Sequence, residues 1–72
     1  MKLTALTRVG RTGNLLSEGE IFEGSWNEIQ KRLDACFING CELEQIGKTN
    51  KWKVYAGWGS HVADIKLEGE FK

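Results

Sequence analysis

One segment of the chain has a helical repeat, and the segments on both sides of it alternate between apolar and polar residues. Ser25 followed by Glu28 forms a capping-box pattern, in which each side chain bonds a free backbone N–H at the start of a helix. The apolar residues that follow recur every three or four positions and form one stripe: Trp26, Ile29, Leu33, Cys36 and Phe37. Asn39-Gly40 then supplies the left-handed conformation that ends many helices. We therefore expect a helix over residues 26–38.

The flanking segments have the period-two pattern of half-buried β-strands. Before the helix we expect a strand over residues 2–9, broken in its alternation by Leu6, and a shorter strand over 18–23 that pairs with it as a hairpin. After the helix we expect strands over residues 41–46, 51–56 and 61–68. In the second of these, Trp52, Val54 and Ala56 share one face, and the other face carries Lys51, Lys53 and Tyr55. In the last, one face carries His61, Ala63, Ile65 and Leu67, and the opposite face carries Val62, Asp64, Lys66 and Glu68.

This order of elements predicts an α+β fold of the type ββαβββ, with an antiparallel sheet of about five strands and one helix packed on one face. A chain of 72 residues has room for a single domain, which we expect over residues 1–72. One helix covers one face of such a sheet and leaves the other open to solvent. The open face is therefore the place to look for function.

The charges balance overall but are segregated along the chain. Ten basic and ten acidic residues disfavour both a strongly basic coat for nucleic acid and an acidic mimic of DNA. Residues 17–46 carry seven acidic side chains against two basic ones, whereas residues 47–66 carry four lysines against one aspartate. We expect Lys51, Lys53, Tyr55 and Lys66 to form a basic and aromatic patch on the open face. Such a patch suits phosphates or the acidic surface of a protein partner.

Trp58 lies between two glycines in a turn that we expect between the last two strands. A large indole at a turn either folds back over a small core or stays exposed as a binding anchor, since tryptophan is enriched among interface hot spots. The candidate partner-binding residues are listed together: Lys51, Lys53, Tyr55, Trp58, His61 and Lys66.

The chain carries few residues suited to catalysis or metal binding. His61 is the one histidine, and the serines lie in no nucleophile motif. Cys36 and Cys41 lack a metal-binding spacing, so we expect them to be core thiols. We expect no enzyme activity, cofactor or metal. No apolar run approaches the roughly 18 residues of a membrane span, and the N-terminus lacks a signal-peptide pattern, so we expect a cytoplasmic protein with no membrane partner.

Gly59-Ser60-His61 resembles the segment that carries the catalytic histidine in HicA-type toxins, which are small RNA-cleaving domains. The resemblance covers these three residues. It implies that His61 would act as a general acid and base on an RNA 2′-hydroxyl.

Over most of the chain, the layout resembles small phage-encoded anti-CRISPR proteins, in particular inhibitors of type I-F systems. The similarity in architecture runs through these segments: Met1-Lys2, Glu18-Gly19-Glu20-Ile21-Phe22-Glu23, the helix from Ser25, the helix exit from Cys36-Phe37 to Gly40, and Trp52-Lys53-Val54-Tyr55. The resemblance implies a non-enzymatic protein that binds a host Cas effector, a ribonucleoprotein, and blocks target DNA.

Three functions thus remain open: a protein-binding inhibitor or adaptor, a direct nucleic-acid binder with Trp58 as a stacking platform, and an RNA-cleaving toxin. We expect the first, because residues suited to binding are present and residues suited to catalysis are few.

Overall fold

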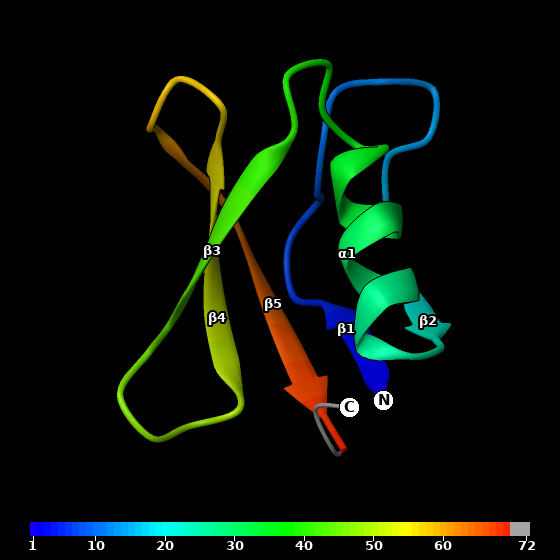
Figure 1. Cartoon of the computed structure of the whole chain (residues 1–72), viewed down its shortest axis with the longest axis vertical. Coiled ribbons are helices and arrows are strands. Elements are labelled where there is room, and N and C mark those ends of the chain that lie inside the picture. The colour runs from blue at the N-terminus through cyan, green and yellow to red at the C-terminus, as the bar shows by residue number, and fades with distance from the viewer. Residues whose placement is uncertain (70–72) are drawn as a thin grey trace.

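The strands form one antiparallel sheet, and the helix packs on one face of it (Figure 1). A computed structural model describes residues 1–69 of the chain. Its elements, in order, are β1 (Lys2–Ala5), β2 (Ile21–Glu23), α1 (Trp26–Asp34), β3 (Cys41–Gln45), β4 (Lys51–Ala56) and β5 (His61–Glu68). The α+β class and the ββαβββ order are therefore confirmed. The last three residues of the domain expected over 1–72 lie outside the described residues.

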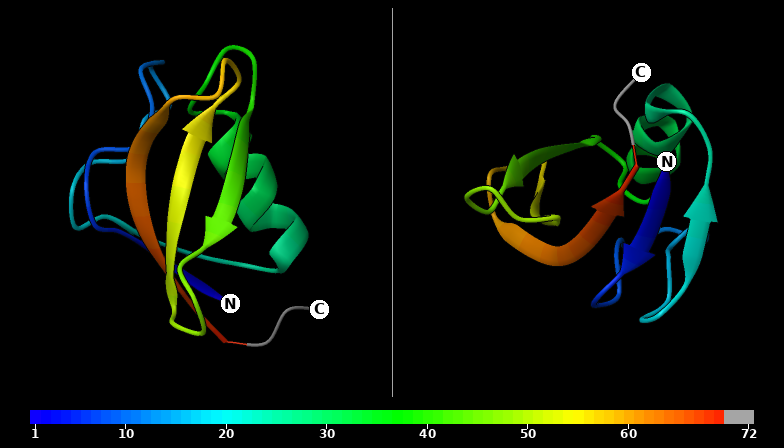
Figure 2. Two further views of the ribbon diagram at one scale, coloured as in Figure 1. Left: turned by 90° about the vertical axis from the view of Figure 1, so that its left-hand side faces the viewer. Right: turned by 90° about the horizontal axis from the view of Figure 1, so that it is seen from below.

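The sheet has the strand order β2-β1-β5-β4-β3, with every neighbouring pair antiparallel. The expected hairpin of the first two strands is present, and Leu3 pairs with Phe22 of β2 on one side and with Leu67 of β5 on the other. The sheet is curved, and α1 lies on its concave side (Figure 2). The strands β2 and β3 form the two edges.

One cluster of buried side chains fills the space between the sheet and the helix. Alternation along β1, β4 and β5 points small and branched residues towards α1, and Ile29 and Leu33 of the helix pack against them. The remaining members come from the turn after the helix and from the segment after β1: Cys36, Phe37, Val9 and Leu16. The apolar stripe expected on the helix thus lies in the core from Ile29 onwards.

The helix begins where the capping box predicts. The Ser25 hydroxyl accepts a hydrogen bond from the Glu28 N–H at 3.2 Å, and the Glu28 carboxylate accepts one from the Ser25 N–H at 3.1 Å. These two bonds satisfy N–H groups that have no partner inside the helix. The bond from the Ser25 backbone lowers the pKa of Glu28 below its ordinary value.

The helix ends at Asp34, so the prediction that it reaches residue 38 is wrong. The carbonyl of Ala35 accepts a hydrogen bond from the Thr12 hydroxyl at 2.8 Å, and the carbonyl of Cys36 accepts one from the Arg11 N–H at 3.0 Å. Donors from a distant loop therefore bond the carbonyls that would accept hydrogen bonds within a longer helix. Gly40 has the predicted positive φ, 72°, but the helix has already ended at its C-cap, Ala35, so Asn39-Gly40 does not stop it.

The two strands with the cleanest alternation, β4 and β5, have the predicted bounds, whereas the other three are shorter than predicted. The strand predicted over 2–9 stops at Ala5, because the N–H groups of Leu6 and Thr7 both bond to the single carbonyl of Asp64, which breaks the ladder. The strand predicted over 18–23 begins only at Ile21, and the strand predicted over 41–46 ends at Gln45. Beyond β1, only Val9 returns to pairing, through a bridge to Leu16.

A shift in register corrects the face assigned to His61. Val54 pairs with Ala63 as alternation predicts, but Tyr55 pairs with His61 rather than with Val62. This β-bulge turns His61 away from the core face, where the sequence pattern placed it, and onto the open face beside Tyr55. Bulges commonly redirect a side chain in this way.

Candidate functional site

The lysines predicted to form a basic patch lie on the open face, but acidic residues lie beside them. Lys51 and Lys66 are cross-strand partners, while Lys53 lies between Asp64 of β5 and Glu44 of β3. The acidic residues on this face come from β2, β3 and β5: Glu23, Glu42, Glu44, Asp64 and Glu68. Lys66 Nζ lies 3.5 Å from Glu68 Oε1. The sheet face therefore lacks the single-sign charge that attracts a phosphate backbone.

Tyr55 and His61 are brought together at the end of this face nearest the β4–β5 turn. Their ring centroids are 5.7 Å apart. The Tyr55 hydroxyl donates a hydrogen bond to Glu44 at 3.4 Å. His61 Nε2 lies 2.9 Å from a carboxylate oxygen of Asp64 and 3.1 Å from the carbonyl of Ala63. Both partners are acceptors, so Nε2 carries a proton.

Trp58 is exposed, but the structure does not bring it together with Lys51 and Lys66. Its side chain is 60% accessible in the β4–β5 turn. Lys51 starts β4, seven residues earlier, which corresponds to roughly 20 Å along an extended chain. The indole instead lies close to Arg11, whose guanidinium carbon is 5.8 Å from the ring centroid. Cation–π contacts form at such distances.

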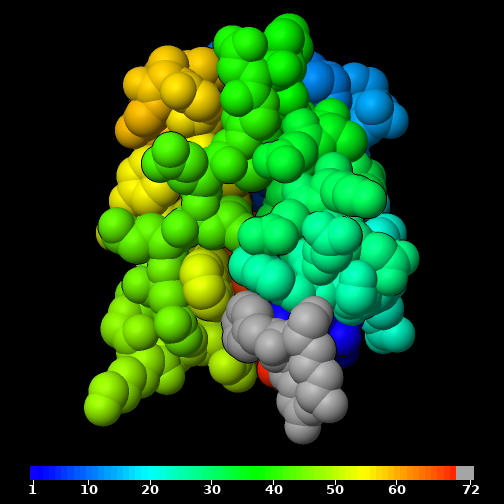
Figure 3. Space-filling model, viewed as in Figure 1, coloured from blue at the N-terminus to red at the C-terminus, as the bar shows by residue number. Residues whose placement is uncertain are grey.

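Trp58 belongs to a patch made by three loops that meet at one end of the molecule. The loop after β1, the turn between α1 and β3, and the β4–β5 turn all lie at the top of Figure 1. In the space-filling view, the green α1–β3 turn stands between the orange β4–β5 turn and the blue loop after β1 (Figure 3). Together they line a hollow of about 490 Å³. We call its lining residues the loop-end patch: Arg11, Thr12, Phe37, Ile38 and Trp58.

The loop-end patch exposes two large apolar side chains, Ile38 and Trp58. Ile38 is 92% accessible, and Phe37 beneath it belongs to the core. An isolated exposed apolar residue needs no explanation, but a contiguous group at the mouth of a hollow is a candidate interaction site. The sequence offered one overlooked signal: Ile38 is apolar, immediately precedes the Asn39-Gly40 stop, and lies off the helical stripe.

A second hollow adjoins the first and has a different character. Its volume is about 280 Å³, and its lining residues are Arg8, Gly10, Arg11, Phe37, His61 and Val62. Arg11 and Phe37 line both hollows. Neither lining includes an acidic side chain among residues 1–69. Both include a basic residue that the sequence pattern does not single out: Arg11 lines both hollows, and Arg8 lines the second.

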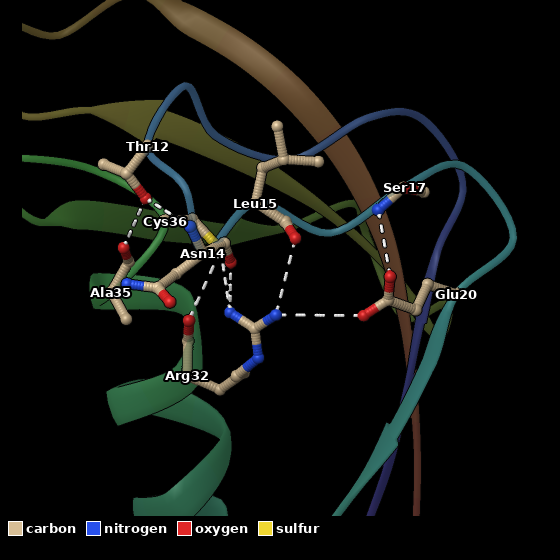
Figure 4. Close-up of polar contacts among 8 residues, drawn as sticks. All are labelled: Thr12, Asn14, Leu15, Ser17, Glu20, Arg32, Ala35 and Cys36. Atoms are coloured by element: carbon tan, nitrogen blue, oxygen red, sulfur yellow. Dashed lines mark hydrogen bonds and ion pairs between the residues drawn. The ribbon is translucent and has the colours of Figure 1, made fainter.

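The loop that carries Arg11 and Thr12 is fastened to α1 by Arg32 (Figure 4). The guanidinium of Arg32 donates hydrogen bonds to the main-chain carbonyls of Asn14 and Leu15, the second at 3.4 Å. It also lies 3.8 Å from the carboxylate of Glu20. With the bond from Thr12 to the end of the helix, these contacts hold the loop-end patch in place before any partner arrives. A preformed site loses less conformational entropy on binding.

Two glycines allow the three loops to approach one another. A Cβ added to Gly10 would lie 2.4 Å from the Cys36 carbonyl oxygen, and Gly10 has a φ of +98°. A Cβ added to Gly57 would lie 2.9 Å from the carbonyl oxygen of Asn39. Only glycine fits where backbones come this close.

Both cysteines are free, and Cys36 is a buried core thiol as predicted. Burial raises the pKa of Cys36. Burial, together with the nearby carboxylate of Asp34, raises the pKa of the half-buried Cys41 to about 12. A thiol becomes a nucleophile or a metal ligand only as the thiolate, so both cysteines are held in their unreactive form. Among residues 1–69, no three histidine, cysteine or acidic side chains gather as a metal site would require.

Comparison of the chain with protein-family models, curated proteins and solved structures finds no match. The resemblances to anti-CRISPR inhibitors and to HicA-type toxins therefore stay predictions. Within residues 1–69, no helix has the length and apolar character needed to span a bilayer.

Proposed function

We propose that this protein is a non-enzymatic binding module that docks on a protein partner through the loop-end patch. The observation that carries this proposal is the pairing of exposed Trp58 and Ile38 on turns that hydrogen bonds and close glycine contacts hold in place. Binding energy in protein interfaces is concentrated in such apolar and aromatic anchors, especially tryptophan and arginine. The loop-end patch offers all of these within one hollow.

The resemblance to type I-F inhibitors gives the proposal its specific form. The partner would be a Cas effector ribonucleoprotein in the cytoplasm of the host cell, and the bound protein would exclude target DNA. A rigid patch suits this mode because it can occupy a surface without mimicking the charge of DNA. The near-balance of charges on the sheet face agrees with that mode.

The test is capture of a purified type I-F effector complex by the immobilised protein. We expect Trp58→Ala and Ile38→Ala each to weaken capture by at least about tenfold, because each removes an anchor. Ile21→Ala is the matched control, since Ile21 is an exposed isoleucine on the edge strand β2, away from the loop-end patch. Absence of capture by the wild type would overturn the specific form. Equal capture by all variants would overturn the loop-end patch as the docking site.

Direct binding of nucleic acid is the second candidate, and one observation favours it. Arg8, Arg11 and Trp58 combine cationic groups with an aromatic ring at one end of the fold, which is how single strands are often held. The site would then be the loop end and not the lysines of the sheet face. Fluorescence polarisation with a single-stranded oligonucleotide tests this, since affinity that rests on phosphates falls steeply as salt is added.

A further inference from the structure

The two adjoining hollows at the loop end differ in chemistry and share two residues. One hollow is apolar, with Phe37, Ile38 and Trp58 in its lining. The other carries Arg8 and His61. Arg11 lines both of them. We propose that together they bind a short acidic peptide segment of the partner, in which a large apolar side chain stands next to one or more carboxylates. This inference rests on the proposed function and names the chemistry of the partner.

The apolar hollow determines the anchor. Its volume of about 490 Å³ is large enough for a side chain, and its lining combines the apolar residues Phe37, Ile38 and Trp58 with Arg11 and Thr12. Burying an apolar side chain there favours binding because it removes apolar surface from water. Binding would also cover the exposed part of Ile38. Removing this further apolar surface from water would add to the affinity.

The basic hollow determines the charge of the residues beside the anchor. Arginine pairs with carboxylates through two parallel hydrogen bonds, and Arg8 and Arg11 both line this hollow. No acidic side chain of residues 1–69 lines either hollow, so an incoming carboxylate meets no competitor in the lining. The nearby Asp64 is engaged by His61 at 2.9 Å and pairs across the sheet with Lys53.

The same observations favour a peptide over a nucleic-acid strand. The guanidinium of Arg11 already lies over the ring of Trp58, the surface on which a base would stack. Ile38, which is 92% exposed, is aliphatic and offers no stacking surface. A strand that ran on from the loop end over the open face would also meet Glu42 and Asp64, which repel phosphates.

A random dodecapeptide display library, panned on the immobilised protein, tests the inference without knowledge of the partner. Peptides that also bind the Ile38→Ala, Trp58→Ala double variant are removed first. We expect the remaining peptides to share a large apolar residue flanked by aspartate or glutamate. Enriched peptides without acidic residues, or no enrichment over the double variant, would overturn the proposal.

A synthetic copy of the most enriched peptide then gives the quantitative test. We expect Arg11→Gln to weaken its binding by at least about tenfold, as loss of a charge-assisted bidentate pair does. Lys48→Gln in the β3–β4 turn is the matched control and should bind normally. Replacing the acidic residues of the peptide by their amides should cause the same loss. A single-stranded RNA of equal length that binds more tightly, and loses binding in Arg11→Gln, would replace the peptide as the occupant.

The two proposals fail in different ways. If Trp58→Ala loses the effector complex while Arg11→Gln retains it, the loop-end patch is the docking site but acidic recognition is wrong. If neither variant affects capture of a partner, the docking site itself is wrong.

Discussion

The guanidinium of Arg32 donates a hydrogen bond to the main-chain carbonyl of Asn14, which lies 18 residues earlier in the chain. This contact joins the surface of α1 to the loop that supplies Arg11 and Thr12 to the loop-end patch. Arg32 is therefore a positioning residue for the site, although it lines neither of the two loop-end hollows.

Arg32→Gln should loosen the loop and lower the free energy of unfolding by about 1–2 kcal/mol, because two main-chain carbonyls lose a charged donor. Urea denaturation measures the stability, and amide hydrogen exchange at Thr12 and Asn14 measures the loop. Lys31→Gln is the control, since Lys31 is the neighbouring basic residue of the same helical turn. Similar exchange rates in the two variants would show that Arg32 does not hold the loop.

Gly10→Ala should destabilise the protein by more than about 2 kcal/mol, because the new Cβ meets a backbone oxygen at a positive φ. Gly57→Ala should cost less, since its closest contact is longer and its φ is ordinary. Both effects are read from chemical denaturation.

Two other glycines separate the causes of that loss. Gly19→Ala meets a positive φ of 84° but has no atom within 4 Å, so it measures the conformational strain alone. Gly13→Ala has neither problem and should be neutral or slightly stabilising. If Gly10→Ala costs no more than Gly19→Ala, the close approach to Cys36 is not what makes Gly10 necessary.

The capping box should make stability depend on pH below neutrality. The backbone N–H of Ser25 lowers the pKa of Glu28 in the folded state, so its stabilising effect is fully present above the unfolded value of 4.5. It is lost as pH falls through the lower folded value. Wild type should thus exceed Glu28→Gln in stability at pH 7, and thermal unfolding at pH 3 should show a smaller difference. A difference that stays constant between the two pH values would contradict this role of the carboxylate.

Removing the Ser25 hydroxyl, the other side chain of the capping box, should lower stability at neutral pH as well. Ser25→Ala should cost about 1 kcal/mol at neutral pH, as the loss of an N-cap hydroxyl usually does. The measurement is again urea denaturation, and a loss below about 0.3 kcal/mol would show that other contacts determine the start of α1.

Cys41 should react slowly with alkylating reagents while the protein is folded. Its pKa is raised to about 12 from 9.0, so at pH 8.5 its thiolate is scarce in the folded state and more abundant in the unfolded one. Because the folded pKa is the higher one, this group stabilises the fold below pH 9 and loses that effect as pH rises towards 12. Mass spectrometry should show iodoacetamide labelling of Cys41 at least about tenfold slower without urea than with it. Equal rates would mean that Asp34 and burial do not protect the thiol.

His61 is the residue through which the RNA-cleaving alternative can be tested. A single histidine oriented by Asp64 has the geometry of a general base, so the RNA-cleaving alternative can be tested directly. We expect purified protein to leave a mixed-sequence RNA intact. Cleavage by the wild type that His61→Ala abolishes would establish the toxin function and overturn the non-enzymatic proposal.

The sequence predicts those parts of the fold that depend on neighbouring residues. The period-two pattern locates β4 and β5 with the right ends, and Ser25 with Glu28 locates the start of α1. The local pattern places the end of α1 too late, because Thr12 and Arg11, far away in the chain, donate hydrogen bonds to the carbonyls of Ala35 and Cys36. Local patterns contain no information about such partners.

The sequence predicts only the part of the candidate site that local patterns reveal. Trp58 stood out because a large indole between two glycines is unusual at a turn. Arg11 and Ile38 did not, since each is unremarkable until the fold places it beside the indole. Alternation alone already places Asp64 and Glu68 on the same face as Lys66, whereas the strand pairing is needed to show that Glu44 lies opposite Lys53.

The shifted pairing at Tyr55 also limits how the hairpin can vary. Beyond Val54, the pairing of β4 with β5 is shifted by one residue relative to the rest of the sheet. The turn that carries Trp58 follows this shifted pairing. Removing one residue, such as Val62, would restore the phase and rotate the tip of the hairpin relative to Arg11 and Ile38. The length of this hairpin, and not only its composition, therefore determines which way the indole faces.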